Sequence, residues 1–310
     1  MNAVIQVKHL SKDFKEVKAV NDLSFTVEEG QVYGFLGQNG AGKSTTIRML
    51  LTLIKPTSGE IEIFGLSLLK HRKEILRQVG AIIERPDLYK YLTALENLRI
   101  FAAMSGVKIS EKKLMDQLTM VGLAERAHSK VKTYSQGMKQ RLGIATALVH
   151  DPKLIILDEP TNGLDPQGIA DVRNLILQLS KEMNKTLLIS SHLLGEMELI
   201  ADSMLIIDKG KKIVEGKVNE LFDPAVMLVE LKTMDDAVTF ERLQQSGLQR
   251  SVQGKRNDCI LLKLHRNEIS GVLKELVQMN VDVVSYHSRH SLEDYFLSLT
   301  SHPHVETLKN

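Results

Sequence analysis

The sequence predicts an α/β fold in two parts: a core built on a parallel sheet with an antiparallel β layer and a helical subdomain, then a small C-terminal α+β domain. A glycine-rich segment at residues 37–45 joins an apolar, strand-like run to a helix-like stretch. Apolar runs and helical spacings then alternate, and the pattern restarts after Gly216. The chain has 310 residues, of which 43% are hydrophobic, so it is long enough for both parts.

The N-terminal segments favour an antiparallel layer beside the core. Residues 4–10, 20–27 and 59–64 alternate or run in β-like fashion. Turn signals such as Glu29-Gly30 separate them. Residues 32–36 form a buried strand in this interpretation, and the helix after the glycine-rich loop spans residues 45–53.

Helical spacing replaces this pattern in the middle of the chain. Leu95, Leu98 and Ala102 repeat at helical intervals, and so do Leu114 and Leu118. The spacing predicts a helical subdomain at about residues 90–145.

Short apolar runs then return. Residues 153–157 and 186–190 enclose a helix-like stretch at 169–183, and residues 204–207 form another apolar run. This order is typical of buried parallel strands with a crossover helix. It completes a first domain of residues 1–220.

The C-terminal part is expected to be a ferredoxin-like domain at residues 221–300. The pattern predicts, in order, a strand at 226–232, a helix at 235–245, strands at 248–252 and 259–264, a helix at 267–279 and a strand at 281–286. This β-α-β-β-α-β order defines the ferredoxin-like arrangement. A last helix is expected at 292–299 and a disordered tail at 301–310.

The glycine-rich segment fits the pattern G-x-x-x-x-G-K-[ST] of a nucleotide-phosphate loop, the P-loop. Its backbone N–H groups and the following helix N-terminus form an anion site. Lys43 reaches the β- and γ-phosphates of ATP, and Ser44 is a candidate Mg²⁺ ligand. The nucleotide-binding residues expected here are Gly37, Asn39, Gly40, Ala41, Gly42, Lys43, Ser44 and Thr45.

Two acids follow the apolar run at residues 154–157. Asp158 and Glu159 stand at the carboxyl edge of a parallel strand, the edge at which the P-loop also opens. Asp158 is expected to hold Mg²⁺ directly or through water. Glu159 is expected to polarise the water that attacks the γ-phosphate, so Glu159 and Lys43 are candidate catalytic residues.

Residues 134–141 begin with Tyr134 and Ser135 and lead into a helix-like stretch. Together with the P-loop and the two acids, this segment resembles the signature loop of the ATP-binding cassette family, and the likeness covers about residues 3–220. The resemblance implies that Ser135, Gln136 and Gly137 cap the nucleotide held by a second copy of the domain. Without it, Ser135 is simply an N-cap.

The same resemblance assigns further positions one by one. Phe14 falls where the family places an aromatic ring against adenine, and His192 falls where it places a histidine that contacts the γ-phosphate. A lone aromatic or histidine is otherwise more often structural. Residues 162–166 resemble the loop that crosses the dimer interface. The resemblance therefore implies an interface built from Ser135, Gly137, Gly163, Leu164 and Asp165.

Glu84 departs from the family pattern, because it stands where glutamine is usual. A carboxylate still ligates Mg²⁺, but it brings negative charge toward the γ-phosphate, so its pairing matters for turnover. Arg85 is the candidate partner. This variant, with the residues that follow it, is similar to ATPase subunits of bacterial exporters for bacitracin and lantibiotic peptides.

Composition and the resemblance together set the expected partners. The net charge is +2, so no basic excess favours nucleic acid. No apolar run approaches the roughly 18 residues of a membrane span, and residues 1–7 lack a signal-peptide layout. The lone Cys259 is expected to be a buried strand thiol.

The resemblance implies ATP and Mg²⁺ as cofactors, and a multi-span permease on a separate chain as partner. It also implies a second cassette domain, in a homodimer or a heterodimer, at the cytoplasmic face of the cytoplasmic membrane. The C-terminal domain is a dimerisation or regulatory element, or a stabilising cap. Two other functions stay open: a soluble cassette ATPase acting on ribosomes or DNA, and a nucleotide sensor that does not hydrolyse ATP.

Overall fold

The protein forms two compact units, Met1–Val218 and Asn219–Asn310. The computed structural model describes residues 2–221, 226–256 and 259–290. The helix expected at 292–299 and the tail expected at 301–310 lie outside the described residues.

The first sheet of unit one is antiparallel, with the strand order β2-β1-β4-β5. Its strands are β1 (Ala3–Asp13), β2 (Lys18–Glu28), β4 (Ser58–Ile63) and β5 (Leu66–Ser67). Leu23, Phe25 and Val27 of β2 are buried and alternate with more exposed residues, so one face of the sheet covers the core. The predicted antiparallel layer is confirmed.

The second sheet is almost entirely parallel, with the order β10-β9-β3-β8-β7-β6. Its strands are β3 (Val32–Leu36), β6 (Val79–Ile82), β7 (Leu154–Asp158), β8 (Thr186–Ser191), β9 (Ser203–Asp208) and β10 (Lys211–Lys217). Every residue of β3, β7 and β8 is buried, which explains why these strands are mainly apolar. Only β10 runs antiparallel, beside β9.

Helix α1 (Lys43–Leu50) packs between the two sheets. Its Ile47 and Leu50 are fully buried and share one hydrophobic core with Leu23 of β2 and Ile156 of β7. This helix begins two residues earlier than the pattern suggested, because Gly42 is its N-cap directly after the P-loop. It also ends three residues earlier.

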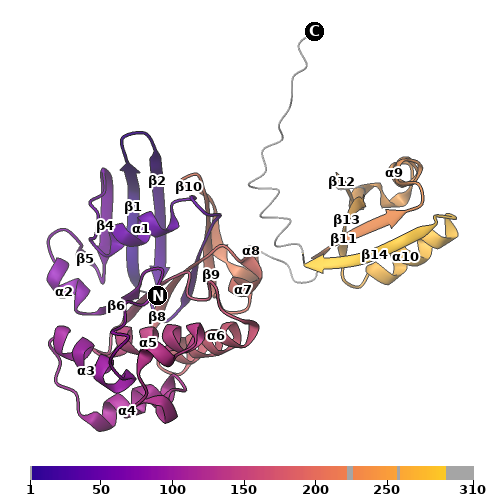
Figure 1. Ribbon diagram of the computed structural model, residues 1–310. Helices are drawn as coiled ribbons and strands as arrows, with labels where there is room; N and C mark the ends of the chain where they lie inside the picture. Colours follow the sequence, from indigo (N-terminus) through magenta and orange to yellow (C-terminus); the bar gives the residue numbers. More distant parts are fainter. Residues whose placement is uncertain (1, 222–225, 257–258, 291–310) are drawn as a thin grey trace. The chain divides into compact units, whose positions relative to one another are not determined.

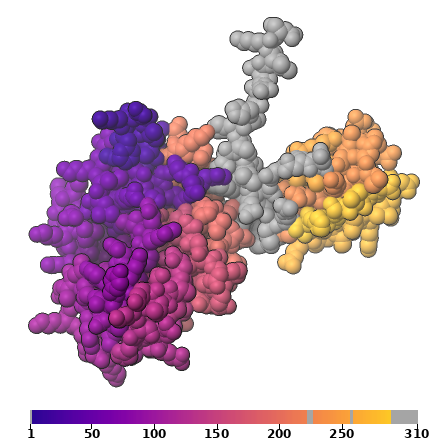
Figure 2. Space-filling view, viewed as in Figure 1, coloured from indigo at the N-terminus to yellow at the C-terminus, as the bar shows by residue number. Residues whose placement is uncertain are grey.

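The helical subdomain contains α3 (Ala94–Met104), α4 (Glu111–Met120) and α5 (Gln136–Leu148), with the short 3-10 helices η1 (Ala124–Arg126) and η2 (Val131–Thr133). Thr93 and Glu96 form a capping box that fixes the start of α3. Figure 1 shows α3 and α4 at the end of unit one away from the β1–β2 hairpin. The same two ends are the magenta and indigo surfaces of this unit in Figure 2.

The remaining helices of the first part of the chain are α2 (Arg72–Leu76), α6 (Pro166–Lys181), α7 (Leu194–Glu198) and α8 (Val218–Leu221). Among the described residues, no helix is both long and apolar enough to cross a membrane.

Unit two contains an antiparallel sheet of order β12-β13-β11-β14. Its elements are β11 (Val226–Thr233), α9 (Asp236–Gln244), η3 (Gly247–Ser251), β12 (Val252–Arg256), β13 (Cys259–His265), α10 (Ile269–Gln278) and β14 (Val283–His290). Buried residues of the helices and strands form a separate core that includes Val229, Leu243, Leu262 and Leu276. The expected ferredoxin-like order is present.

Two details of unit two correct the sequence-based expectations. Most of residues 248–252 is a 3-10 turn and not a strand, because the Ser246 hydroxyl accepts a hydrogen bond from Leu248 N at 3.1 Å and caps the turn. Cys259 is half-buried, since it lies on the sheet face opposite to that of the buried Ile260.

Candidate functional site

The P-loop connects β3 to α1 and its backbone leaves no room for side chains at two of its glycines. A Cβ on Gly37 would lie 2.6 Å from the carbonyl oxygen of Ile207. Gly42 has φ of +108° and a Cβ there would lie 2.5 Å from the carbonyl oxygen of Ala19. Both positions therefore require glycine, which explains the spacing of the motif.

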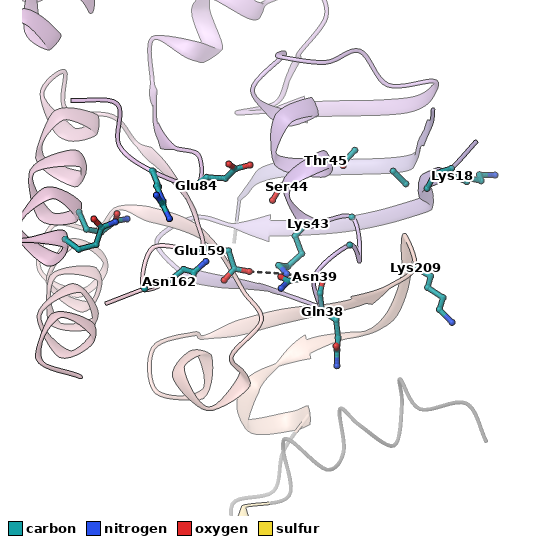
Figure 3. Close-up of a pocket in the computed structure, with 18 residues that line it drawn as sticks. Lys18, Gln38, Asn39, Lys43, Ser44, Thr45, Glu84, Glu159, Asn162 and Lys209 are labelled. Atoms are coloured by element: carbon teal, nitrogen blue, oxygen red, sulfur yellow. Dashed lines mark hydrogen bonds and ion pairs between the residues drawn. The ribbon is translucent and has the colours of Figure 1, made fainter. Parts of the chain in front are cut away.

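Lys43 is the first residue of α1 and is 5% exposed. Its ammonium donates hydrogen bonds to the carbonyl oxygens of Gly37 at 2.6 Å and Gln38 at 3.3 Å. It also forms an ion pair with Glu159, with 3.1 Å between Nζ and Oε1. The side chain is thus curled back over its own loop toward the end of β7 (Figure 3).

A cavity of about 1110 Å³ opens at this place. Its volume suits a nucleotide-sized ligand. Its lining residues are Val17, Lys18, Ala19, Gln38, Asn39, Gly40, Gly42, Lys43, Ser44, Thr45, Glu84, Arg85, Gln136, Gln140, Glu159, Asn162, Gly163 and Lys209. They come from the start of β2 and the turn before it, the P-loop and α1, the segment after β6, α5, the loop after β7 and the turn between β9 and β10. Figure 3 draws them as sticks.

Asp158 ends β7 and is fully buried. Its Oδ1 accepts a hydrogen bond of 2.5 Å from the Ser190 hydroxyl, whereas its Oδ2 has no hydrogen-bond partner within the described part of the chain. A buried carboxylate oxygen needs a partner, and a cation or its bound water provides one. The residue therefore fits a metal site.

Glu159 follows directly and has a left-handed backbone, with φ of +50°. Its N–H donates to the Ser190 hydroxyl at 2.9 Å, which holds the turn. Its side chain is 14% exposed, with Oε1 facing Lys43 and Oε2 lying 2.7 Å from Nδ1 of His192. The two acids of this strand end thus face different partners.

His192 follows β8, the neighbour of β7 in the sheet. A carboxylate only accepts hydrogen bonds, so Nδ1 of His192 carries the hydrogen in its contact with ionised Glu159. The sequence suggested Lys43, Glu159 and His192 from separate motifs. The structure brings the three side chains into one chain of contacts.

Glu84 lies two residues beyond β6 and also has a left-handed backbone, with φ of +60°. Its Oε1 is 2.6 Å from Nη2 of Arg48 in α1. The expectation that Arg85 pairs with Glu84 was therefore wrong, although Arg85 does line the cavity. The left-handed turn separates the two neighbouring side chains, and α1 supplies the guanidinium instead.

The segment resembling the signature loop begins α5. Ser135 is the N-cap, and its hydroxyl accepts a hydrogen bond from Met138 N at 3.2 Å. Gln136 lines the cavity, whereas Ser135 and Gly137 do not. This position is compatible with both roles considered for Ser135, as a simple helix N-cap and as a residue that contacts a partner's nucleotide. An N-cap at an exposed helix end also presents N–H groups to solvent.

Residues of the loop between β7 and α6 have two structural roles: some line the cavity and one caps α6. Asp165 caps α6 by accepting a hydrogen bond from Gly168 N at 3.1 Å. Asn162 and Gly163 line the cavity, and Leu164 is half-buried. Within one chain, Asp165 and Leu164 lie outside the cavity lining.

Phe14 lies in the turn between β1 and β2, where it exchanges backbone hydrogen bonds with Val17. Its ring is 50% exposed, and Nζ of Lys12 lies 5.0 Å from the ring centroid. Val17 of the same turn and Lys18, the first residue of β2, line the cavity, whereas Phe14 does not. The turn itself therefore borders the cavity.

Several lining residues were missed by the sequence interpretation. Lys18 and Lys209 are cations without a motif, and Gln140 belongs to the segment 134–141 but was given no site role. Lys209 occupies the turn between β9 and β10, with φ of +46°. Nothing local marks these positions, because their place at the cavity follows from the packing of the two sheets.

Comparison with known proteins agrees with this geometry. Residues 20–162 match the family described as "ABC transporter". The chain is 44% identical over 301 residues to the bacitracin transport ATP-binding protein BcrA of Bacillus licheniformis, covering 96% of this chain and 98% of that protein. It is 40% identical over 239 residues to the lantibiotic transport ATP-binding protein SrtF of Streptococcus pyogenes, covering 77% of this chain and 99% of that protein.

A solved structure is also similar. The dimeric structure of MJ0796, a bacterial ABC transporter cassette, shares 26% sequence identity with this chain at a TM-score of 0.63. The likeness covers 69% of this chain and 98% of that chain.

Proposed function

Because the chain belongs to the ABC transporter family of ATP-binding proteins, we propose that it powers a separate membrane permease that exports a drug, an antibiotic or a peptide. The chain is an ATP-binding subunit that hydrolyses ATP to ADP and phosphate to drive transport. The names of its relatives support the proposed cargo class, since one serves bacitracin transport and another lantibiotic transport.

The observation that carries the proposal is the contact chain Lys43–Glu159–His192 at the mouth of the P-loop. Lys43 is placed to bind the β- and γ-phosphates together with the N–H groups of the loop. In this proposal Glu159 accepts a proton from the attacking water. His192 contacts the γ-phosphate and also orients the Glu159 carboxylate, which the 2.7 Å contact supports.

Three residues fit Mg²⁺ in this proposal. Ser44 lines the cavity one residue after Lys43. Asp158, at the end of β7, offers its Oδ2, which has no hydrogen-bond partner among the described residues. Glu84 lines the cavity from the segment after β6. Oxygen ligands of this kind are those Mg²⁺ prefers, and the ion bound with ATP neutralises phosphate charge.

We propose further that two copies of the chain close around two ATP molecules. In this arrangement Ser135, Gln136 and Gly137 of one copy face the phosphates of the ATP held by the other, and Gly163, Leu164 and Asp165 meet at the interface. The exposure of Ser135, Gln136, Gly163 and Asp165 supports this role. Dimeric cassette structures among the similar proteins support it as well. A homodimer is proposed, with a heterodimer of related ATPases as the alternative.

We also propose that the permease binds the segment at residues 84–98, at the cytoplasmic face of the cytoplasmic membrane. Tyr89 and Tyr91 support this assignment, because 48% and 80% of their side chains are exposed. Exposed aromatic side chains are enriched where partners bind. The C-terminal unit, with a core of its own, is proposed as a dimerisation or regulatory element, and a stabilising cap is the alternative.

Purification of the intact complex tests the proposal. Tagged Glu159→Gln protein is expressed in its native host, the membranes are solubilised gently with Mg-ATP, and copurifying proteins are identified. A multi-span permease is expected. The matched control is the Glu159→Gln protein that also carries Lys43→Ala, which should capture less permease because it binds ATP weakly. Ribosomal proteins or nucleic acid in place of a permease would favour a soluble function and contradict the proposal.

A further inference from the structure

The ion pair between Arg48 and Glu84 joins the P-loop helix to the segment after β6. Nη2 of Arg48 lies 2.6 Å from Oε1 of Glu84. Arg48 is one turn beyond Ser44 in α1, so the two side chains leave the same face of the helix. Glu84 and Ser44 both line the cavity (Figure 3). The pair therefore sits at the side of the cavity where the metal and the γ-phosphate are expected.

Two acids among the lining residues face a ligand that is itself a polyanion. Glu159 is compensated by Lys43, at 3.1 Å. Glu84 is compensated by Arg48, which does not line the cavity. In this structure, each of these two acids thus forms an ion pair with a cation. Lys18, Arg85 and Lys209 remain in the lining to meet phosphate charge, with no ion pair to either of these acids.

The backbone conformation of Glu84 and its contact with Arg48 together determine where the carboxylate lies. Its backbone is left-handed, a conformation that is uncommon for a residue with a Cβ. The side chain of Glu84 is 62% exposed and that of Arg48 is 42% exposed, so packing constrains Glu84 little. The contact with Arg48 is what sets its direction, because a hydrogen bond between two charged groups is stronger than one between neutral groups.

We propose that Arg48 is a positioning residue for nucleotide binding: it orients the Glu84 carboxylate and offsets its charge, so that Mg-ATP enters a site without uncompensated negative charge at this wall. The inference rests on the proposed function, in which the bound anion is Mg-ATP. Removing the cation leaves one unit of negative charge near the phosphates, which at a partly exposed site weakens binding by about tenfold.

The test is a double-mutant cycle on the dissociation constant for a non-hydrolysable Mg-ATP analogue, measured by calorimetry. Arg48→Met keeps the length of the side chain and removes its charge, and should raise the dissociation constant about tenfold. Arg48→Lys keeps the charge and should therefore change the dissociation constant about twofold or less. In protein carrying Glu84→Gln, the further change Arg48→Met should have about twofold effect or none, because the carboxylate it compensates is gone.

Arg99→Met is the matched control. Arg99 pairs with Glu111, and the pair is about as exposed as Arg48–Glu84, at 50% and 59%. It joins α3 to α4 and neither residue lines the cavity. An exposed ion pair contributes little to stability, so neither arginine variant should unfold, and thermal unfolding checks this. The control should bind nucleotide like the wild type.

Two outcomes would overturn the inference. One is unchanged binding by Arg48→Met. The other is an equal loss of binding with and without Glu84→Gln, which would mean that Arg48 merely supports α1. Phosphate release by the wild type is measured in parallel and tests the proposed function separately. The double-mutant cycle measures only the binding of a non-hydrolysable analogue, so its result does not depend on whether the protein hydrolyses ATP.

Discussion

Nζ of Lys43 lies 3.1 Å from Oε1 of Glu159, and the two side chains are only 5% and 14% exposed. The contact joins the first residue of α1 to the residue that follows β7. A phosphate group bound in the P-loop competes with Glu159 for the ammonium, since both are anions. Phosphate binding and the freedom of the Glu159 carboxylate are thereby linked through one cation.

The first prediction concerns Lys43→Ala. The variant should lose about 10- to 100-fold in ATP affinity, because a charge-assisted contact of about 1.5–3 kcal/mol to the phosphates is removed. Calorimetry with Mg-ATP measures the loss. The control Lys181→Ala removes an exposed lysine that pairs with Asp202 outside the cavity lining and should bind normally. Equal affinity in all three proteins would exclude Lys43 from phosphate binding.

The second prediction concerns Asp158→Asn. Asparagine still accepts the Ser190 hydrogen bond but carries no charge for a cation, so the Mg²⁺ concentration for half-maximal hydrolysis should rise at least about tenfold. A titration of ATPase activity with Mg²⁺ measures this change. Asp151→Asn, at an acid that is 86% exposed, serves as the control. A wild-type Mg²⁺ dependence in Asp158→Asn would contradict the assignment.

The third prediction separates kcat from binding at His192. His192→Ala should lower kcat at least about tenfold, because Glu159 loses the contact at Oε2 that orients it. The dissociation constant for Mg-ATP should rise by a smaller factor than kcat falls, since Lys43 and the P-loop still bind the phosphates. His128→Ala, at an exposed histidine of the helical subdomain, is the control. A loss of affinity for Mg-ATP without a loss of kcat would contradict the proposed role of His192 in orienting Glu159.

The fourth prediction concerns stability and pH. Burial lowers the pKa of His150, although its Nε2 lies 3.1 Å from the carbonyl oxygen of Val79. The unfolded chain binds a proton near the ordinary pKa of about 6.5 while the folded chain does not, so the contribution of His150 to stability is present above that pH and lost as the pH falls. His150→Gln, which does not titrate, should show a smaller fall in unfolding temperature between pH 7.5 and pH 5 than the wild type.

Calorimetric scans of both proteins at the two pH values test this prediction. His128→Gln, which replaces an exposed histidine, is the control for the loss of a titrating group. An identical pH response in wild type and His150→Gln would contradict the burial effect.

Local patterns predicted much of this fold. The strands β3, β7 and β8 have mainly apolar sequences because both of their faces are buried. The P-loop was found because its glycines form a recognisable motif. The structure requires glycine at Gly37, where the carbonyl oxygen of Ile207 lies close, and at Gly42, where φ is positive. The strand β10 was missed, because an edge strand rich in lysine lacks the buried pattern of its neighbours.

The site was predicted less completely, for a physical reason. Individual residues such as Lys43, Asp158 and Glu159 carry strong motifs, but their partners come from other elements. Sequence proximity suggested Arg85 for Glu84, whereas the left-handed turn and the packing of α1 bring Arg48 to it. Likewise, Lys18 and Lys209 reach the cavity only through the packing of the two sheets.

The measurement that tests the central claim most directly is single-turnover hydrolysis by Glu159→Gln, with Mg-ATP binding measured on the same protein. The claim predicts a fall in the rate of phosphate release of about 100-fold or more, because the side chain no longer accepts a proton from water. ATP binding should be retained and a closed dimer should accumulate on size-exclusion chromatography. Glu182→Gln, at an exposed acid after α6, should hydrolyse normally. Wild-type phosphate release by Glu159→Gln would contradict the account.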